Sequence, residues 1–262
     1  MTLLFDEPPA AITGHRAHPE HKLEMVANAC TFFRCDGCQE PGGGGGGRWY
    51  RCEPCNFDLH IFCARAPATL QHTLFTGSTF KFLDKPPQAE DGRKCDACGE
   101  RVLGFVFHCE KKDLDLHPCC ASLKERIVHE GVVFELRKET SHRWCSFCQN
   151  RCRKFWFFRC RFNGEDLYIH LTCLKKEARD RWEAMTFNRL SGADQIVHAG
   201  APMIKSALQS MSKKTRRSSG FKHFGEIAHF VGRTVISFLL GNPMPVLFEA
   251  VAGPIIDGLL QG

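Results

Sequence analysis

One compact segment of the chain carries eight cysteines and histidines at spacings typical of metal ligands. They are His21, Cys35, Cys38, Cys52, Cys55, His60, Cys63 and His72. Two Cys-x2-Cys pairs stand among them, and in such a pair one tight turn supplies two of the four tetrahedral ligands that zinc prefers. Eight ligands in one segment therefore predict two zinc sites.

Part of this pattern recurs twice further along the chain. The phrase ending in His60-x2-Cys63 returns as His117-x2-Cys120 and as His170-x2-Cys173, each time after a Cys-x2-Cys pair and an aromatic run typical of a strand. The repeats predict small zinc-stabilised α+β modules, as three tandem fingers with a short twisted sheet and a short helix each. The ligands expected in the later two fingers are Cys95, Cys98, His117 and Cys120, then Cys145, Cys148, His170 and Cys173.

The later two repeats lack part of the first. The Cys-x2-Cys partner of Cys109 would be Lys112, and that of Cys160 would be Asn163. The other quartets survive whole, so we expect two zinc ions in the first finger and one in each of the others, four in total. A partial second site in the second finger stays open, with His108, Cys109 and His129 as its ligands.

The composition indicates a protein built on ligands rather than on one apolar core. The chain has 262 residues and 16 cysteines, and the last cysteine is Cys173. Fingers this small need a metal or disulfides for stability. The N-terminus lacks the basic and apolar regions of a secretory signal, and no run of about 20 apolar residues predicts a membrane span. We therefore expect reduced, zinc-bound cysteines in a cytoplasmic or nuclear protein.

Several cysteines and histidines fall outside these predicted sites. Cys30, Cys119 and Cys152 are interpreted as small buried hydrophobic side chains. His15, His18 and His142 are interpreted as solvated side chains, with hydrogen bonding to the ligands as the alternative.

The order of ligands resembles the C1-type zinc fingers, and more closely the divergent C1-type (DC1) cysteine/histidine-rich proteins of plants. The phrases His15-x2-His18-x2-His21 and Cys35-Asp36-Gly37-Cys38 fit that family, and the resemblance covers about residues 15–180. It implies interleaved sites in the first finger. One zinc would be held by His21, Cys52, Cys55 and His72, and the other by Cys35, Cys38, His60 and Cys63.

The chain divides into six predicted parts. We expect an N-terminal extension at 1–14, fingers at 15–72, 73–130 and 131–182, a linker with a basic cluster at 183–223, and an amphipathic helical tail at 224–262. A basic cluster beside an apolar helix suits an anionic membrane surface or a partner groove. Packing of the tail on the fingers, or pairing between copies, is the alternative.

The predicted function is that of a zinc-binding, non-catalytic interaction or adaptor protein. Closed quartets leave no open position for a catalytic zinc, so we expect no enzyme and no small-molecule substrate. We expect a protein partner, and the resemblance implies a role in signalling or stress responses. Interspersed acidic residues disfavour nucleic acid as a partner.

Two alternatives remain at this point. Diacylglycerol or anionic-membrane binding is one, although Arg48-Trp49 stands where typical C1 fingers carry a Gln-Gly pair. A PHD or RING-like finger, in chromatin reading or ubiquitin transfer, is the other. It would draw Cys95 and Cys98 into the first finger, whereas independent fingers predict that mutation of Cys95 unfolds the second finger alone.

Overall fold

A computed structural model describes residues 7–27, 31–43, 47–129, 132–138, 142–152, 154–162 and 165–190. The predicted tail at 224–262, and the linker from 191 onward with its basic cluster, lie outside the described residues.

Module 1, as we call residues 7–64, contains a four-stranded antiparallel sheet in the order β1-β2-β5-β6. In β5, the consecutive residues Trp49 and Tyr50 are both buried, which suits a strand that packs on both faces. A two-stranded ribbon, β3-β4, and the short helix α1 complete the module. The elements are β1 (Ala11–Ile12), β2 (Leu23–Ala27), β3 (Phe32–Arg34), β4 (Pro41–Gly43), β5 (Arg48–Cys52), β6 (Phe57–His60) and α1 (Ile61–Ala64).

Module 2, residues 69–121, has a four-stranded antiparallel sheet in the order β10-β9-β8-β7. Its first strand, β7, pairs with β8 although it precedes His72, the last residue of the predicted first finger. The second sheet therefore begins before the predicted boundary. The elements are β7 (Thr69–Gln71), η1 (Thr73–Phe75), β8 (Thr79–Leu83), β9 (Val106–Cys109), η2 (Glu110–Lys112), β10 (Leu114–Leu116) and α2 (Pro118–Ala121).

Module 3, residues 126–190, has a four-stranded antiparallel sheet in the order β11-β12-β13-β14, followed by a long helix. The strands are β11 (Arg126–His129), β12 (Val132–Arg137), β13 (Phe157–Phe162) and β14 (Glu165–His170). Instead of a short helix, α3 (Leu171–Leu190) spans 20 residues and continues past the predicted end at 182. Among the described residues, no helix is both long and apolar enough to cross a membrane.

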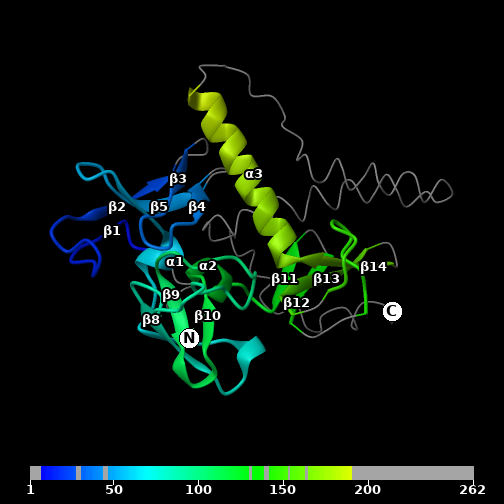
Figure 1. The fold of residues 1–262 in the computed structure, drawn as a ribbon. Helices are drawn as coiled ribbons and strands as arrows, with labels where there is room; N and C mark the ends of the chain where they lie inside the picture. The colour runs from blue at the N-terminus through cyan, green and yellow to red at the C-terminus, as the bar shows by residue number, and fades with distance from the viewer. Residues whose placement is uncertain are drawn as a thin grey trace, which may run out of the picture.

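The modules share one continuous core instead of standing apart. Phe105 N in module 2 donates to Gly37 O in module 1, at 2.8 Å. The same link recurs one module later, where Trp156 N donates to Ala97 O at 2.8 Å. Figure 1 shows α3 running back from module 3 to β3 and β4 of module 1, where Trp182 Nε1 donates to Phe33 O at 2.9 Å.

Buried aromatic side chains fill the spaces between these links. Phe80, Phe107, Phe134 and Phe158 belong to one cluster that contains apolar residues of all three modules. The expectation of a fold built on ligands alone is therefore incomplete, because apolar burial also stabilises the described part of the chain.

Candidate metal centres

Three of the four Cys-x2-Cys pairs, those that begin at Cys35, Cys95 and Cys145, lie in tight turns that bring both thiols to one site. In module 1, Cys35 N donates to Glu40 O at 3.0 Å and Gln39 N donates to Cys35 O at 2.9 Å. Gln39 has a φ of 64°, the left-handed conformation that closes the turn. The turns at Cys95 and Cys145 repeat both hydrogen bonds. The same residue types at the same spacing therefore give the same local structure three times.

A histidine faces each of these turns in a fixed orientation. Its Nε2 donates to a backbone carbonyl, so its Nδ1 lone pair is directed at the thiols. The carbonyl oxygens and their Nε2 distances are Pro41 O for His60 (2.9 Å), Arg101 O for His117 (3.0 Å) and Arg151 O for His170 (3.2 Å). The Nδ1 atoms lie 3.4 Å, 3.5 Å and 3.3 Å from Cys38, Cys98 and Cys148 Sγ respectively.

Three quartets of Cys and His are brought together in this way. The ligand atoms of each quartet lie within 4.8 Å of one another. The first two quartets are fully buried and the third is partly buried. We name them inner site 1 (Cys35, Cys38, His60, Cys63), inner site 2 (Cys95, Cys98, His117, Cys120) and inner site 3 (Cys145, Cys148, His170, Cys173).

In each inner quartet, contacts among the thiols favour the thiolate form at one cysteine and oppose it at another. The pKa is lowered at Cys38, Cys98 and Cys145, and it is raised at Cys63, Cys120 and Cys173. Burial opposes ionisation of Cys38, yet hydrogen bonds with Cys35 and Cys63 lower its pKa to about 6. A hydrogen bond with Cys173 lowers the pKa of Cys145 to about 3, against the effect of burial. Three thiols and one imidazole in a tetrahedral arrangement are a usual donor set for structural zinc, so the residues present fit the metal.

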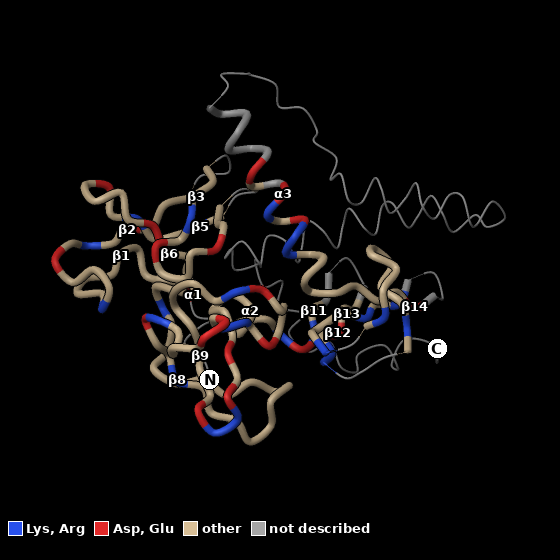
Figure 2. The backbone as a smooth tube through the Cα atoms, viewed as in Figure 1, with Lys and Arg blue, Asp and Glu red and all other residues tan. Residues whose placement is uncertain are grey.

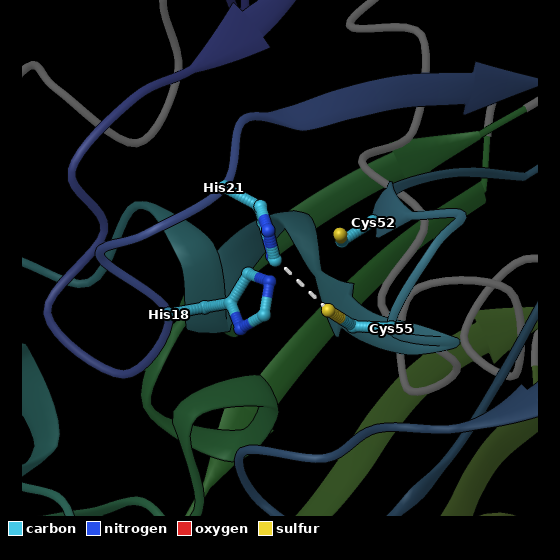
Figure 3. Close-up of side chains that lie close together, drawn as sticks. All are labelled: His18, His21, Cys52 and Cys55. Carbon is cyan, nitrogen blue, oxygen red and sulfur yellow. Dashed lines mark hydrogen bonds between the residues drawn. The ribbon is translucent and has the colours of Figure 1, made fainter.

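A fourth quartet, the outer site, also belongs to module 1. It consists of His18, His21, Cys52 and Cys55, with His21 Nδ1 at 3.1 Å from Cys55 Sγ (Figure 3). The His18 ring stacks on Phe57 at 4.7 Å. His18 Nε2 is buried and has no hydrogen-bond partner within the part of the chain that the structure describes. A buried nitrogen of this kind, aimed at two thiols, fits a metal ligand.

His72 does not join the outer site, although the family resemblance implied that it would. His18 is the fourth residue of this site instead. After α1 the chain crosses into module 2, so His72 lies there, where its Nδ1 accepts from Leu74 N at 3.1 Å. Its Nε2 donates to Leu123 O at 3.2 Å, and its ring lies 4.6 Å from that of Trp156. The spacing His18-x2-His21, equal to that of the cysteine pairs, was the sequence signal for this ligand.

The cysteines left over from the damaged repeats are buried thiols. Among the described residues, neither Cys109 nor Cys160 belongs to a ligand quartet. Burial raises the pKa of Cys160 to about 12, and burial raises that of Cys152 to the same range. His108 contacts Asp115 Oδ1 at 2.9 Å instead of a metal site. Cys152 is buried, as the sequence interpretation predicted, and Cys30 lies outside the described residues.

Two groups near the inner sites come from neighbouring modules, which sequence spacing did not indicate. Cys119 of module 2 lies 3.6 Å from His60 Nδ1 in inner site 1. Lys175 of module 3 lies 3.5 Å from Cys98 Sγ and 3.4 Å from His117 Nδ1 in inner site 2. A zinc with three thiolates and one imidazole carries a formal negative charge, which a buried ammonium offsets.

The quartets also distinguish between the finger types considered from the sequence. Cys95 and Cys98 lie with His117 and Cys120, within module 2. The PHD order of ligands would instead require both cysteines to complete a site of module 1. The described geometry does not bring them there.

The ligand arrangement of module 1 agrees with comparison against known families. Residues 16–64 match the family model described as C1 domain. This segment is therefore similar to C1 domains. The match contains both histidines of the outer site and ends just after Cys63, so it excludes His72. No curated protein and no solved structure matches the chain.

The C1 domain match and the quartets together establish zinc as the metal. C1 domains bind zinc, and the four quartets fit about four zinc ions per chain, as the ligand count predicted. Two of the quartets belong to module 1, and modules 2 and 3 have one quartet each.

Proposed function

We propose that the chain is a non-catalytic interaction adaptor in which zinc has a purely structural role. The observation that carries the proposal is that every quartet supplies four Cys or His ligands. Structural zinc takes four protein ligands, whereas catalytic zinc usually keeps one position for water or substrate. The ligand histidines of the inner sites also donate hydrogen bonds to backbone carbonyls, which fixes the orientation of their rings.

The adaptor consists of three tandem C1-like fingers in this proposal. Modules 2 and 3 lie outside the family match, but they repeat the cysteine turn and the histidine orientation of module 1. Each module also has its own four-stranded antiparallel sheet. Repetition of one local structure at one spacing supports a common finger type.

Trp144 is the residue we assign to partner contact. It precedes the first cysteine of inner site 3 and is 55% exposed. The guanidinium of Arg151 lies 5.3 Å from its ring centroid. Trp and Arg are enriched in the hot spots of protein interfaces, and the backbones of these two residues pair in a β-bridge beside the cysteine turn. A protein partner therefore has a pre-organised aromatic anchor on module 3.

The other candidate contact residues have internal partners. Trp49 is 2% exposed and donates from Nε1 to Asp58 Oδ1 at 2.8 Å. Arg48 pairs with Glu7. Both side chains thus make contacts within module 1, and these contacts give no support to insertion of the Arg48-Trp49 segment into a membrane. Figure 2 shows acidic and basic residues interspersed along the described chain, which likewise gives no support to a nucleic-acid footprint.

Proximity labelling with the full-length chain tests the adaptor function. We expect that some of the proteins labelled by the wild type are no longer labelled by Trp144→Ala. Leu103→Ala is the matched control, because Leu103 is also exposed, at 60%, and precedes module 2 strand β9. Identical neighbours for Trp144→Ala and wild type would contradict the assignment of the partner surface. We propose signalling or stress responses as the setting of this adaptor, since the resemblance of its sequence to divergent C1-type proteins implies such a role.

A further inference from the structure

Cys119 stands at a zinc site that belongs to another module. It is a residue of α2 in module 2, next to the inner site 2 ligand Cys120, and it is 1% exposed. Its Sγ lies 3.6 Å from Nδ1 of His60 in inner site 1. The ligand sulfurs of Cys38 and Cys63 lie 3.4 Å and 3.8 Å from the same nitrogen. By this measure, Cys119 is as close to the site as its own ligands are.

The contacts of Cys119 involve three of the four ligands of inner site 1. Besides contacting His60, its thiol interacts electrostatically with those of Cys38 and Cys63, since each of these cysteines shifts the pKa of Cys119. Cys38, His60, Cys63 and Cys119 are again three thiols and one imidazole. This second donor set has the chemistry of the first, with Cys119 in the role of Cys35.

We propose that Cys119 is a reserve zinc ligand of inner site 1, which can replace Cys35. Zinc in structural sites holds four ligands, so the fifth group exchanges with one of them instead of adding to them. Cys119 gives up its proton when it binds, and the released Cys35 thiolate takes one up, so the charge of the site is unchanged. In the exchanged set, one zinc ion links module 1 directly to module 2.

Inner site 2 provides a natural comparison without a reserve thiol. The residue two positions after the ligand histidine is Cys119 in module 2, and it is Thr172 in module 3. Thr172 Oγ1 donates to Cys98 O, and the group that reaches the Cys98 thiol is the Lys175 ammonium at 3.5 Å. A protonated ammonium cannot bind zinc. Loss of Cys95, the equivalent of Cys35, should therefore find no replacement.

Zinc content of four variants of the full chain tests the proposal. Zinc per chain is measured by mass spectrometry of the metal after gel filtration in zinc-free buffer. The four quartets of the wild type correspond to four zinc ions per chain. We expect that Cys35→Ala and Cys119→Ala each retain four. We expect only three in Cys95→Ala and in the double variant Cys35→Ala/Cys119→Ala. Three zinc ions in Cys35→Ala, equal to Cys95→Ala, would overturn the proposal.

A second measurement decides the matter if Cys35→Ala does not fold. Zinc release to an excess of a coloured chelator is followed in wild type, Cys119→Ala and Cys160→Ala. Cys160 is a buried thiol outside the described quartets, which makes its variant a control for simple loss of packing. We expect one zinc to leave several-fold faster in Cys119→Ala alone, because the reserve ligand no longer recaptures it. Release at the wild-type rate in Cys119→Ala would overturn the proposal.

Discussion

Lys175 in α3 of module 3 forms a buried ion pair with Glu40 in the cysteine turn of module 1. The same ammonium lies 3.2 Å from Glu100 Oε2 in module 2, beside inner site 2. Burial opposes the charge of Lys175, but Cys98 and Glu40 raise its pKa well above the usual value. One side chain thus joins all three modules at a zinc site.

Replacement of Lys175 is expected to destabilise the whole described region. Lys175→Met removes the ammonium partner of the buried Glu40 carboxylate, and breaking a buried ion pair in this way costs about 3–5 kcal/mol. Lys176→Met is the control, since Lys176 is exposed and such changes cost about 0.5 kcal/mol or less. Urea unfolding of the zinc-loaded proteins measures both. Equal stability of the two variants would show that the ion pair contributes little.

The outer site predicts different results for two histidines. His18→Ala removes a ligand whose buried Nε2 has no other partner among the described residues, so we expect three zinc ions per chain instead of the four that the quartets hold. His72→Ala should retain all four, because the structure places His72 on Leu74 and Leu123 in module 2. Metal analysis of the purified variants measures the difference. The reverse pattern would restore His72 as the ligand.

The three inner quartets could be predicted from the sequence because their geometry is local. A Cys-x2-Cys turn and a His-x2-Cys phrase fix four donors with little help from the rest of the fold. Whether His18 or His72 completes the outer site could not be predicted from local spacing alone. It depends on where the chain goes after Cys63, and β7 carries it into the next sheet.

The contacts between modules could not be predicted for a related reason. The Phe105–Gly37 link and the Lys175–Glu40 pair join residues far apart in the sequence, and no spacing rule specifies such contacts. The length of α3 was also underestimated. A short helix is predicted after His170, whereas the helix continues through Trp182, where it packs on β3 and β4 of module 1.

Loss of one zinc should therefore affect more than one module. Cys95→Ser disables inner site 2, which contacts Thr172 and Lys175 of α3 and, through Lys175, Glu40 of module 1. We expect faster amide hydrogen exchange in module 2, in the first turns of α3 and in the β3–β4 ribbon. Exchange measured by mass spectrometry reports on each segment, with Cys160→Ser as the control. Faster exchange confined to residues 69–121 would instead support independently folding fingers.

The interface between modules 1 and 2 leaves no room for a side chain at Gly104. A Cβ there would lie 2.0 Å from Gly37 O, and that oxygen already accepts the Phe105 N hydrogen bond at 2.8 Å. Because the obstacle is backbone, Gly104→Ala must push the two modules apart or lengthen that hydrogen bond. We expect a loss of about 1–3 kcal/mol in the free energy of unfolding, as for overpacking in a core.

The neighbouring Leu103 provides the control for this change. Its side chain is 60% exposed, so Leu103→Ala should alter stability by about 0.5 kcal/mol or less. Urea unfolding of the zinc-loaded proteins compares the two variants in one experiment. If Gly104→Ala proved as stable as Leu103→Ala, the close contact of the Gly37 and Gly104 backbones would not persist in solution. A larger loss in Gly104→Ala means that apolar and backbone contacts between modules stabilise the fold together with zinc.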